Sequence, residues 1–376
     1  MIKIIADENI EFLEEAFSSL GELTKLPGRK ISNKELNEAD VLLIRSVTQI
    51  NESLLRGTNI KFVGTATIGR DHVDKDYLAS NKIFFTDAAG CNSDAVTEYV
   101  FTALYQIAAG ENIDLRNKAI GIVGVGNIGG RIARLAKEIG LEVLKNDPPL
   151  KRKTDSREYL ELDELMEADI ITLHVPLNKD GIDKTLHLFD SERLHKLKDN
   201  TILINTSRGP VIDNASLNET ITPKKLSVVL DVWENEPNIN TGLLNKVKIG
   251  TPHIAGYSLE GKVNGTIILY KALCNFLKVP PTWEPKLKTA NEKIIISSTE
   301  VQQSLQEIFS SIYKIREDDL STRKIMNLDA KERANYFDLL RKNYPLRREF
   351  PNYSVKMKTW NTKIENIIKA FRFKLE

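Results

Sequence analysis

The feature that most restricts the fold is a glycine-rich turn, Gly-Val-Gly-Asn-Ile-Gly, at residues 124–129. An apolar run at 119–123 precedes it and a helical pattern at 128–139 follows, so the turn joins a buried strand to a helix. In such a unit Gly124 makes the tight turn, Gly126 lets a pyrophosphate approach the backbone, and Gly129 allows close packing of the helix. The turn therefore predicts a dinucleotide-binding βαβ unit, with a structural turn that binds no ligand as the alternative.

Short apolar runs separated by helical patterns extend over most of the chain. Continuous apolar runs are typical of strands buried on both faces of a parallel sheet. In the first hundred residues we predict strands at 2–5, 41–44, 62–65 and 83–85, with helices at 11–20, 74–80 and 96–108. A second series predicts strands at 119–123, 142–144, 170–173, 202–205, 227–230 and 247–249, with helices at 128–139, 163–168, 191–197 and 215–220. The fold class is therefore α/β, with two doubly wound parallel sheets.

The C-terminal quarter has a different pattern. A long helix is predicted at 259–277, followed by a proline-rich break at 278–285 that is the best candidate for a linker. Beyond the break, basic residues outnumber acidic ones, and helices are predicted at 330–343 and 362–373. These helices alternate charged and apolar positions, which favours amphipathic helices at a subunit interface over a nucleic-acid surface.

Length and composition exclude several classes of protein. A chain of 376 residues is expected to form two or three domains. Its 53 Lys and Arg nearly balance its 52 Asp and Glu, which argues against a nucleic-acid partner. No apolar run approaches the roughly 20 residues of a membrane helix, and the N-terminus lacks the apolar core of a signal peptide. Two cysteines provide neither a disulfide framework nor a zinc site, so we expect a cytoplasmic protein without a metal or a membrane partner.

Asp147 indicates which dinucleotide is bound. It follows the second strand of the nucleotide series, where a carboxylate accepts hydrogen bonds from ribose hydroxyls and repels a 2′-phosphate. NAD is therefore favoured over NADP. Two readings stay open: Lys145 could attract a 2′-phosphate, and Asp147 could simply be a turn carboxylate before Pro148.

Polar residues with acid–base potential follow three further strands. Of the five histidines, His253 lies just after the last strand of the nucleotide series, where ligands meet doubly wound sheets. Arg208 follows the strand at 202–205, and Glu236 lies beyond the strand at 227–230. His253 would take the proton of a substrate hydroxyl, Glu236 would orient and stabilise the imidazolium, and Arg208 would bind a carboxylate. Each residue alone has a structural alternative, whereas together they suit oxidation of a 2-hydroxy acid.

The segments GVGNIG, NTSRGPVID, DVWENEP and PHIAG resemble those of the D-isomer-specific 2-hydroxyacid dehydrogenases. The resemblance implies that Arg208, Glu236 and His253 are catalytic and that the nucleotide domain is inserted into the substrate domain. This resemblance runs to about residue 280 and implies a flavodoxin-like substrate domain at 1–95 and 256–280 and a Rossmann NAD-binding domain at 96–255. A C-terminal α+β dimerisation domain at 281–376 is implied only by a narrower resemblance to one branch of the family. The implied cofactor site comprises Gly124, Gly126, Asn127, Ile128, Gly129, Asp147, Val175, Thr206, Asp231 and Gly256.

A narrower resemblance concerns one branch of this family. It is carried by MIKIIADENI, LLIRSVTQINESLL, IKFVGTATIGRDHVD, HIAGYSLEGK and the C-terminal extension. The branch oxidises 4-phospho-D-erythronate with NAD in the route to pyridoxal phosphate, and its members are homodimers. The resemblance implies that Ser46, Thr67 and Tyr257 contact the substrate.

The phosphate of such a substrate requires a second anion site, in the first domain. Arg45, Arg70 and His72 are the cationic candidates. We favour Arg45 because it directly follows the strand at 41–44; its structural alternative is a surface ion pair.

Two other functions stay open. The chain could oxidise another 2-hydroxy acid of the phosphoglycerate or glycerate type. It could also be a non-catalytic NAD-sensing scaffold, because a fold does not determine a function. The presence of all three of Arg208, Glu236 and His253 argues against the scaffold.

Overall fold

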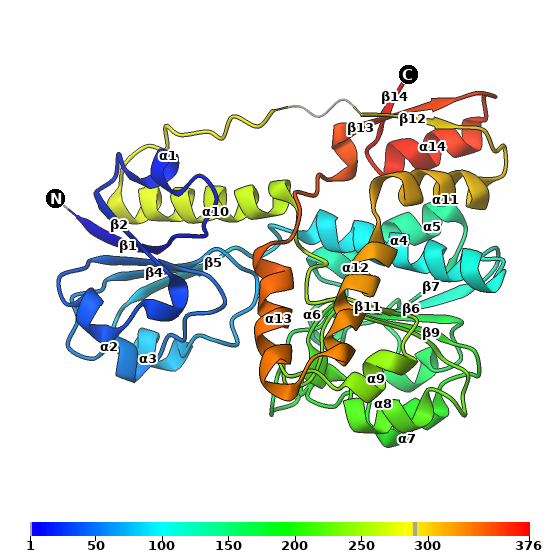
Figure 1. The fold of residues 1–376 in the computed structure, drawn as a ribbon, viewed down its shortest axis with the longest axis horizontal. Coiled ribbons are helices and arrows are strands. Elements are labelled where there is room, and N and C mark those ends of the chain that lie inside the picture. Colours follow the sequence, from blue (N-terminus) through cyan, green and yellow to red (C-terminus); the bar gives the residue numbers. More distant parts are fainter. Residues whose placement is uncertain (1, 289–291) are drawn as a thin grey trace. The chain divides into compact units, whose positions relative to one another are not determined.

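The computed structural model describes residues 2–288 and 292–376, whose elements fall into two units (Figure 1). The first combines Met1–Asn92 with Ser258–Lys288, and the second combines Ser93–Tyr257 with Thr289–Glu376. The first unit is therefore discontinuous in sequence, and the C-terminal region clusters with the second unit. The division into three domains stays a prediction.

The first unit is built on five parallel strands in the flavodoxin-like order β2-β1-β3-β4-β5. The strands are β1 (Lys3–Asp7), β2 (Glu22–Leu26), β3 (Val41–Ile44), β4 (Phe62–Thr65) and β5 (Phe84–Asp87). The helices are α1 (Leu13–Phe17), α2 (Glu52–Leu55), α3 (Lys75–Ser80) and α10 (Leu259–Leu277), with 3₁₀ turns at Gly28–Lys30 and Asn33–Leu36. The sequence predicted four of these strands and missed β2, in which no residue is fully buried, so that its sequence has no apolar run.

Successive residues of the inner strands are buried on opposite faces of this sheet. In β3, Val41 and Leu43 pack with residues of α1 and α10, whereas Leu42 and Ile44 pack with residues of α2 and α3. This two-sided burial is what the continuous apolar run predicted.

The second unit contains six parallel strands in the order β11-β10-β9-β8-β6-β7. They are β6 (Ala119–Val123), β7 (Glu142–Asn146), β8 (Ile170–Leu173), β9 (Ile202–Asn205), β10 (Ser227–Leu230) and β11 (Ile249–Gly250). Beyond β7, Tyr159 makes an isolated parallel bridge to Lys145, next to a hydrogen bond of 2.7 Å from Leu160 N to Lys145 O. This bridge occupies the place of the third strand of a Rossmann sheet, so the third strand is reduced to a single bridge.

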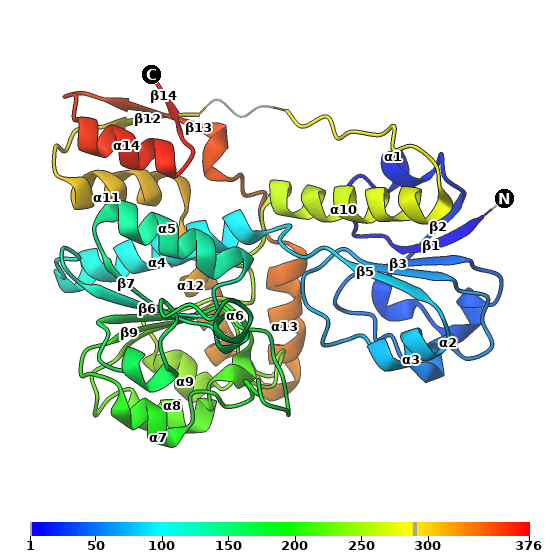
Figure 2. The ribbon, with the colours of Figure 1, turned by 180° about the vertical axis from the view of Figure 1, so that it is seen from behind.

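Helices cover both faces of the six-stranded sheet. Figures 1 and 2 show α4 (Ser93–Glu111) and α5 (Asn127–Ile139) on one face, and α7 (Ser191–Lys196), α8 (Asn214–Thr220) and α9 (Thr241–Lys246) on the other. The predicted helix at 163–168 is wrong: a 3₁₀ turn forms at Leu162–Leu165 instead. The sequence also missed α6 (Pro148–Thr154) and α9, and α1 is shorter than the predicted helix at 11–20.

The C-terminal region adds a three-stranded parallel sheet and four helices. The strands are β12 (Glu292–Ile296), β13 (Tyr353–Met357) and β14 (Lys374–Leu375), in that order. The helices are α11 (Val301–Ile312), α12 (Ile315–Arg323), α13 (Ala330–Lys342) and α14 (Thr362–Ala370). The two helices predicted here from sequence correspond to α13 and α14, with α14 ending three residues before the predicted end.

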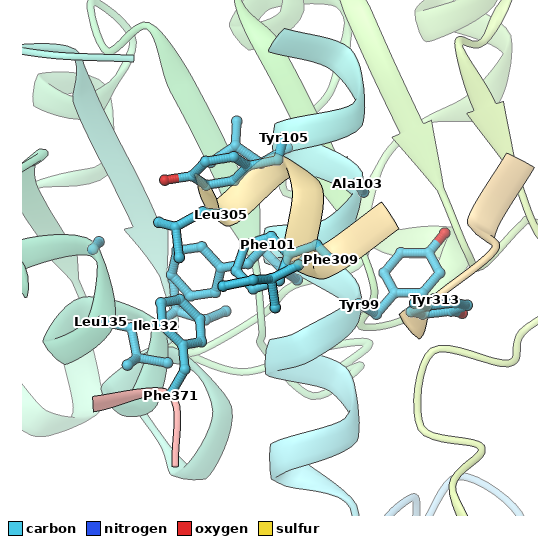
Figure 3. Close-up of a cluster of buried hydrophobic side chains, with 14 of the residues drawn as sticks. Tyr99, Phe101, Ala103, Tyr105, Ile132, Leu135, Leu305, Phe309, Tyr313 and Phe371 are labelled. Atoms are coloured by element: carbon cyan, nitrogen blue, oxygen red, sulfur yellow. The ribbon is translucent and has the colours of Figure 1, made fainter. Parts of the chain in front are cut away.

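An aromatic core joins this region to α4 and α5. Figure 3 shows Phe101 of α4, Phe309 of α11 and Phe371 close together, with ring centroids 5.0 Å apart for Phe101–Phe371 and 5.2 Å for Phe309–Phe371. Gln302 of α11 also pairs with the backbone of the loop after α4, accepting from Leu115 N at 2.9 Å and donating to Ile113 O at 2.8 Å. Helix α4 is apolar nearly all round because one side packs on the sheet and another on α11.

Within the described part of the chain, no helix is long and apolar enough to cross a membrane. The same residues contain no group of three or more histidine, cysteine or acidic side chains placed to hold a metal ion.

Candidate active site

The glycine turn connects β6 to α5, as its sequence predicted. Gly124 has φ of 87°, and a Cβ there would lie 2.7 Å from His174 O. A Cβ on Gly129 would lie 1.9 Å from Gly124 O, so the close approach of α5 requires a residue without a side chain. Around Gly126 no atom lies within 4 Å of an added Cβ. Helix α5, of 13 residues, begins at Asn127 without a side-chain cap, so its first N–H groups are available for an anion beside open space.

Asp147 lies at the end of β7 and organises the same turn. Its Oδ2 accepts from Val125 N at 2.8 Å, and its Oδ1 caps α6 by accepting from Leu150 N at 3.0 Å. Each carboxylate oxygen keeps a further lone pair for a ribose hydroxyl. Lys145 pairs with Glu158 and lies 5.4 Å from the centre of the Tyr159 ring, so its charge is already used. The open cradle, the uncapped helix and the carboxylate together fit NAD.

The remaining predicted cofactor residues surround this turn or the loops beside it. Val175 follows β8, and its side chain lies next to Gly124. Thr206 follows β9 and is buried, with Oγ1 3.4 Å from His174 Nδ1. Asn127 and Ile128 form the first turn of α5, and Gly256 lies three residues after His253. Contact of each with a cofactor stays a prediction.

His253 and Glu236 form a hydrogen-bonded pair. The His253 Nδ1 atom is 2.8 Å from Glu236 Oε2, and Glu236 Oε1 accepts from Trp233 N at 2.8 Å. Burial opposes ionisation of Glu236, but the charge and hydrogen bond of His253 outweigh it, and the pKa of the carboxyl is lowered on balance. In the neutral imidazole this carboxylate favours the tautomer that carries its proton on Nδ1, which leaves a lone pair on Nε2; among the described residues Nε2 has no hydrogen-bond partner.

Arg208 reaches the same edge of the sheet from the neighbouring strand. It directly follows the turn after β9, and its Nη1 donates to Ser207 O at 2.7 Å. A Cβ on Gly209 would lie 1.9 Å from Trp233 C, so this glycine brings the Arg208 turn against the loop that carries Glu236. Because β9, β10 and β11 are adjacent and parallel, Arg208, Glu236 and His253 emerge from the same edge.

Asp231 fixes the loop that carries His253, a role that the sequence did not reveal. It is 1% exposed. Its Oδ1 accepts from Thr251 Oγ1 at 2.6 Å and Ile254 N at 2.8 Å, and its Oδ2 accepts from Ala255 N at 2.9 Å. Its backbone oxygen accepts from His253 N at 2.7 Å. The predicted contact of Asp231 with the cofactor remains a prediction beside this positioning role. The available signal in the sequence was its place directly after the apolar run of β10 (Ser227–Leu230).

The other histidines have partners that suit structural roles. Desolvation lowers the pKa of His174 to about 3, so it stays neutral, and its Nε2 is 2.8 Å from Thr172 Oγ1. His72 is buried next to Thr65, His187 pairs with Glu234, and His195 lies 2.7 Å from Ser191 O. His253 is thus the histidine best arranged for proton transfer.

The predicted substrate residues of the first unit follow two adjacent parallel strands. Arg45 and Ser46 follow β3, and Thr67 follows β4 with its Oγ1 2.9 Å from Thr65 Oγ1. Arg70 is paired with Asp87. Among the described residues Arg45 has no ion-pair partner, which keeps it the best candidate for binding phosphate.

Tyr257, the fourth predicted substrate residue, belongs to the second unit. Its ring lies 5.9 Å from that of Tyr344 at an interplanar angle of 80° and 5.9 Å from the guanidinium carbon of Arg341. Both neighbours come from the C-terminal region, and the sequence gave no sign of them because they lie more than eighty residues away.

Comparison with known proteins agrees with this geometry. The sequence model of the D-isomer specific 2-hydroxyacid dehydrogenase NAD-binding domain matches residues 95–255. The chain is 46% identical over 361 residues to an erythronate-4-phosphate dehydrogenase of Proteus mirabilis, with 94% of each chain covered. The chain belongs to the family of D-isomer-specific 2-hydroxyacid dehydrogenases.

Three further comparisons extend this similarity to other parts of the chain. An erythronate-4-phosphate dehydrogenase of Salmonella arizonae is 46% identical over 359 residues, again with 94% of each chain covered. The structure of the D-lactate dehydrogenase of Aquifex aeolicus, complexed with NAD and lactic acid, is 26% identical with a TM-score of 0.61 and covers 73% of this chain and 95% of that one. A model described as a domain of unknown function, DUF3410, matches residues 287–370. The narrower resemblance to the erythronate-4-phosphate branch is therefore confirmed, and the family's nucleotide domain binds NAD.

Proposed function

We propose that the chain oxidises 4-phospho-D-erythronate to the corresponding 2-oxo acid, 2-oxo-3-hydroxy-4-phosphobutanoate, with NAD, in the route to pyridoxal phosphate. The observation that carries the proposal is the Glu236–His253 pair, which leaves the imidazole Nε2 without a hydrogen-bond partner among the described residues and able to act as a general base. The sequence relation to two dehydrogenases with this name supports the choice of substrate.

In the proposed reaction, NAD bound at the glycine turn and at Asp147 would supply the acceptor for the hydride that leaves C2 of the substrate. His253 Nε2 removes the proton of the C2 hydroxyl, and Glu236 stabilises the resulting imidazolium through its bond to Nδ1. Arg208 binds the C1 carboxylate and stabilises the carbonyl oxygen that develops at C2. Asp231 keeps the backbone of the His253 loop fixed during the transfer.

The phosphate end of the substrate is assigned to the first unit. Arg45 supplies the cation, and Ser46 and Thr67 supply hydroxyl groups. Tyr257 contributes a further polar contact. A hydroxyacid that lacks the phosphate would leave Arg45 without a partner, which gives the site a reason to prefer phosphorylated substrates.

The first test measures NADH absorbance with purified protein, NAD and 4-phospho-D-erythronate. The reverse direction, NADH with the 2-oxo acid, belongs in the same experiment because oxidation of an alcohol by NAD is often uphill. Glycerate and 3-phosphoglycerate serve as competing substrates. A much higher kcat/KM for either acid would replace the proposed substrate, and NAD binding without any turnover would favour the sensing scaffold.

We also propose that the protein is a cytoplasmic homodimer that associates through the C-terminal region. Five large apolar side chains are exposed there: Ile295, Leu320, Leu339, Leu346 and Trp360. Because contiguous exposed apolar side chains mark protein interfaces, these five residues are the candidates for the subunit contact. Light scattering after size-exclusion chromatography should give twice the mass of 42.5 kDa, and a monomer at micromolar concentration would contradict the proposal. Cell fractionation tests the location.

A further inference from the structure

The loop after His253 is held by side chains of the C-terminal region. Arg347 donates from Nε to Tyr257 O at 2.9 Å and from Nη2 to Ala255 O at 2.6 Å. Its guanidinium carbon lies 4.4 Å from the centre of the Tyr313 ring, and the side chain is 9% exposed. The backbone two to four residues after the general base is thus fixed from outside the Rossmann sheet.

The side chain of Tyr257 is held by the same segment. Arg341, in the last turn of α13, places its guanidinium carbon 5.9 Å from the centre of the Tyr257 ring, and Tyr344 packs its ring edge-to-face on another side. A cation near the face of an aromatic ring is attracted to it, and more strongly where water is excluded. The phenol of Tyr257 is therefore restrained by two residues three positions apart.

Packing alone does not account for a cation at position 341. The Nε of Arg341 is buried and has no hydrogen-bond partner among the described residues, which is unfavourable for a polar atom. Burial lowers the pKa of Arg341, whereas Tyr257 and Glu236 raise it, and the raised pKa that results keeps the side chain charged. A methionine would fill the same space without a buried polar atom.

We propose that Arg341 is a positioning residue that holds the Tyr257 hydroxyl in the orientation required for substrate. The C-terminal region, matched by a domain model of unknown function, thereby takes part in catalysis in addition to any role in association. The proposal rests on the proposed function, because it assumes that Tyr257 contacts the substrate.

A double-mutant cycle tests the proposal through kcat/KM for the phosphorylated hydroxyacid. R341M keeps the length of the side chain and removes its charge, and Y257F removes the hydroxyl that Arg341 is proposed to aim. We expect R341M to lower kcat/KM about 30-fold in the wild type and less than about 3-fold in Y257F, with the loss mainly in KM for the hydroxyacid and none in KM for NAD. The same 30-fold loss in both backgrounds, or no loss in the wild type, would overturn the proposal.

Two further variants separate positioning from folding. K342M removes the same charge from the next, exposed residue of α13 and should stay within about 2-fold of the wild type. R341K keeps a cation near the ring and should recover a large part of the loss. If R341M does not fold, R341Q, which also removes the charge, takes its place in the cycle.

A measurement without substrate makes failure of this inference distinguishable from failure of the proposed function. Tyr257 N donates to Ile254 O at 2.8 Å, so its amide should be protected from hydrogen exchange. We expect R341M, but not K342M, to accelerate exchange in residues 254–258 by about 3-fold or more. If the wild type oxidises no hydroxyacid, the proposed function fails while exchange still tests the positioning; unchanged exchange in R341M would overturn the inference whatever the substrate.

Discussion

Polar side chains at the strand ends differ between the six-stranded and the five-stranded sheet in how firmly hydrogen bonds hold them. In the six-stranded sheet, Asp231, Glu236 and His253 are locked by backbone and side-chain hydrogen bonds. In the five-stranded sheet, Arg45 and Ser46 extend from β3 without a side-chain partner among the described residues, and Ser46 is exposed. Proton transfer requires fixed geometry, whereas a long cation can find a phosphate without being held in advance. The difference suggests that one edge performs the chemistry and the other selects the substrate.

Among the residues fixed at the strand ends of the six-stranded sheet, we expect replacement of His253 to cause the largest loss of activity. His253 has φ of 58°, a left-handed conformation that asparagine tolerates, so His253→Asn removes the base with little backbone strain. We expect kcat to fall about 10³-fold with the Kd for NAD unchanged, because removing a general base costs about 10²–10⁴-fold. Stopped-flow or steady-state NADH absorbance gives kcat, and titration calorimetry gives the Kd.

His195→Asn is the matched control, since His195 lies exposed on α7 and should be replaceable without effect. A tenfold or greater weakening of NAD binding in His253→Asn would show that His253 supports the cofactor site instead.

Asp231→Asn tests whether the edge is locked by this buried carboxylate. In either orientation the amide nitrogen would face a backbone N–H, that of Ile254 or that of Ala255, leaving buried donors unsatisfied. We expect the free energy of unfolding to fall by about 2–3 kcal/mol and kcat/KM to fall about 10–100-fold. Urea denaturation and initial rates measure the two effects.

Asp213→Asn provides the comparison, because Asp213 caps α8 and asparagine caps a helix about as well. If Asp231→Asn is no more harmful than Asp213→Asn, the loop after His253 is held by other contacts.

The sequence predicted the strands of both sheets better than it predicted the contacts between distant segments. Runs such as residues 41–44 and 202–204 are buried on both faces, an environment that apolar residues satisfy without needing hydrogen-bond partners. Strand β2 was missed because its partly exposed residues carry no such pattern. The bridge at Tyr159 was missed because a single buried residue forms no apolar run. The Pro-Pro pair after Asp147 suggested a turn, yet proline is favoured in the first turn of a helix, and α6 starts there.

The same limit applies to the candidate site. The site residues that were predicted lie at strand ends, which short local motifs can indicate. Arg341 and Arg347 contact the loop after His253 although about ninety residues separate the two segments. No sequence motif in either segment indicates these contacts. The positioning role of Asp231 was hidden in a similar way, because its partners include Thr251, Ile254 and Ala255, some twenty residues along the chain.

Arg45→Ala tests the proposed phosphate site at the strand ends of the five-stranded sheet. Because Arg45 is proposed to bind only the phosphate, we expect kcat/KM for 4-phospho-D-erythronate to fall about 30-fold and that for D-erythronate to change less than about 3-fold. The unfolding free energy should be unchanged, in contrast to Asp231→Asn. Initial rates with the two substrates give the comparison.

Arg56→Ala is the control in the same unit: Arg56 is exposed, forms an i,i+4 pair with Glu52, and should be nearly neutral. Equal losses with the phosphorylated and unphosphorylated substrates would remove the phosphate role from Arg45 and, with it, the functional contrast between the two edges.

The smallest effect concerns Asp318 of α12, whose carboxylate interacts electrostatically with Asp231. It accepts a hydrogen bond from Tyr344 Oη at 2.9 Å. Burial raises its pKa from 3.8 to about 6; Tyr344 and Arg347 oppose the rise, and Asp231 adds to it. The folded protein therefore binds a proton more tightly than the unfolded chain, so the stability that this proton contributes is lost as pH rises through about 6. Between pH 5 and pH 8 the loss should be roughly 1 kcal/mol.

Asp318→Asn removes this titration, so its free energy of unfolding relative to the wild type should increase by roughly 1 kcal/mol from pH 5 to pH 8. Urea denaturation of both proteins at the two pH values measures the difference, and Asp329→Asn, at the exposed N-cap of α13, serves as the control. A pH-independent difference would mean that Asp318 is not destabilised by burial in the folded protein. In that case Asp231 would be a buried charged carboxylate next to His253, and Asp318 in the C-terminal region would not be a second one.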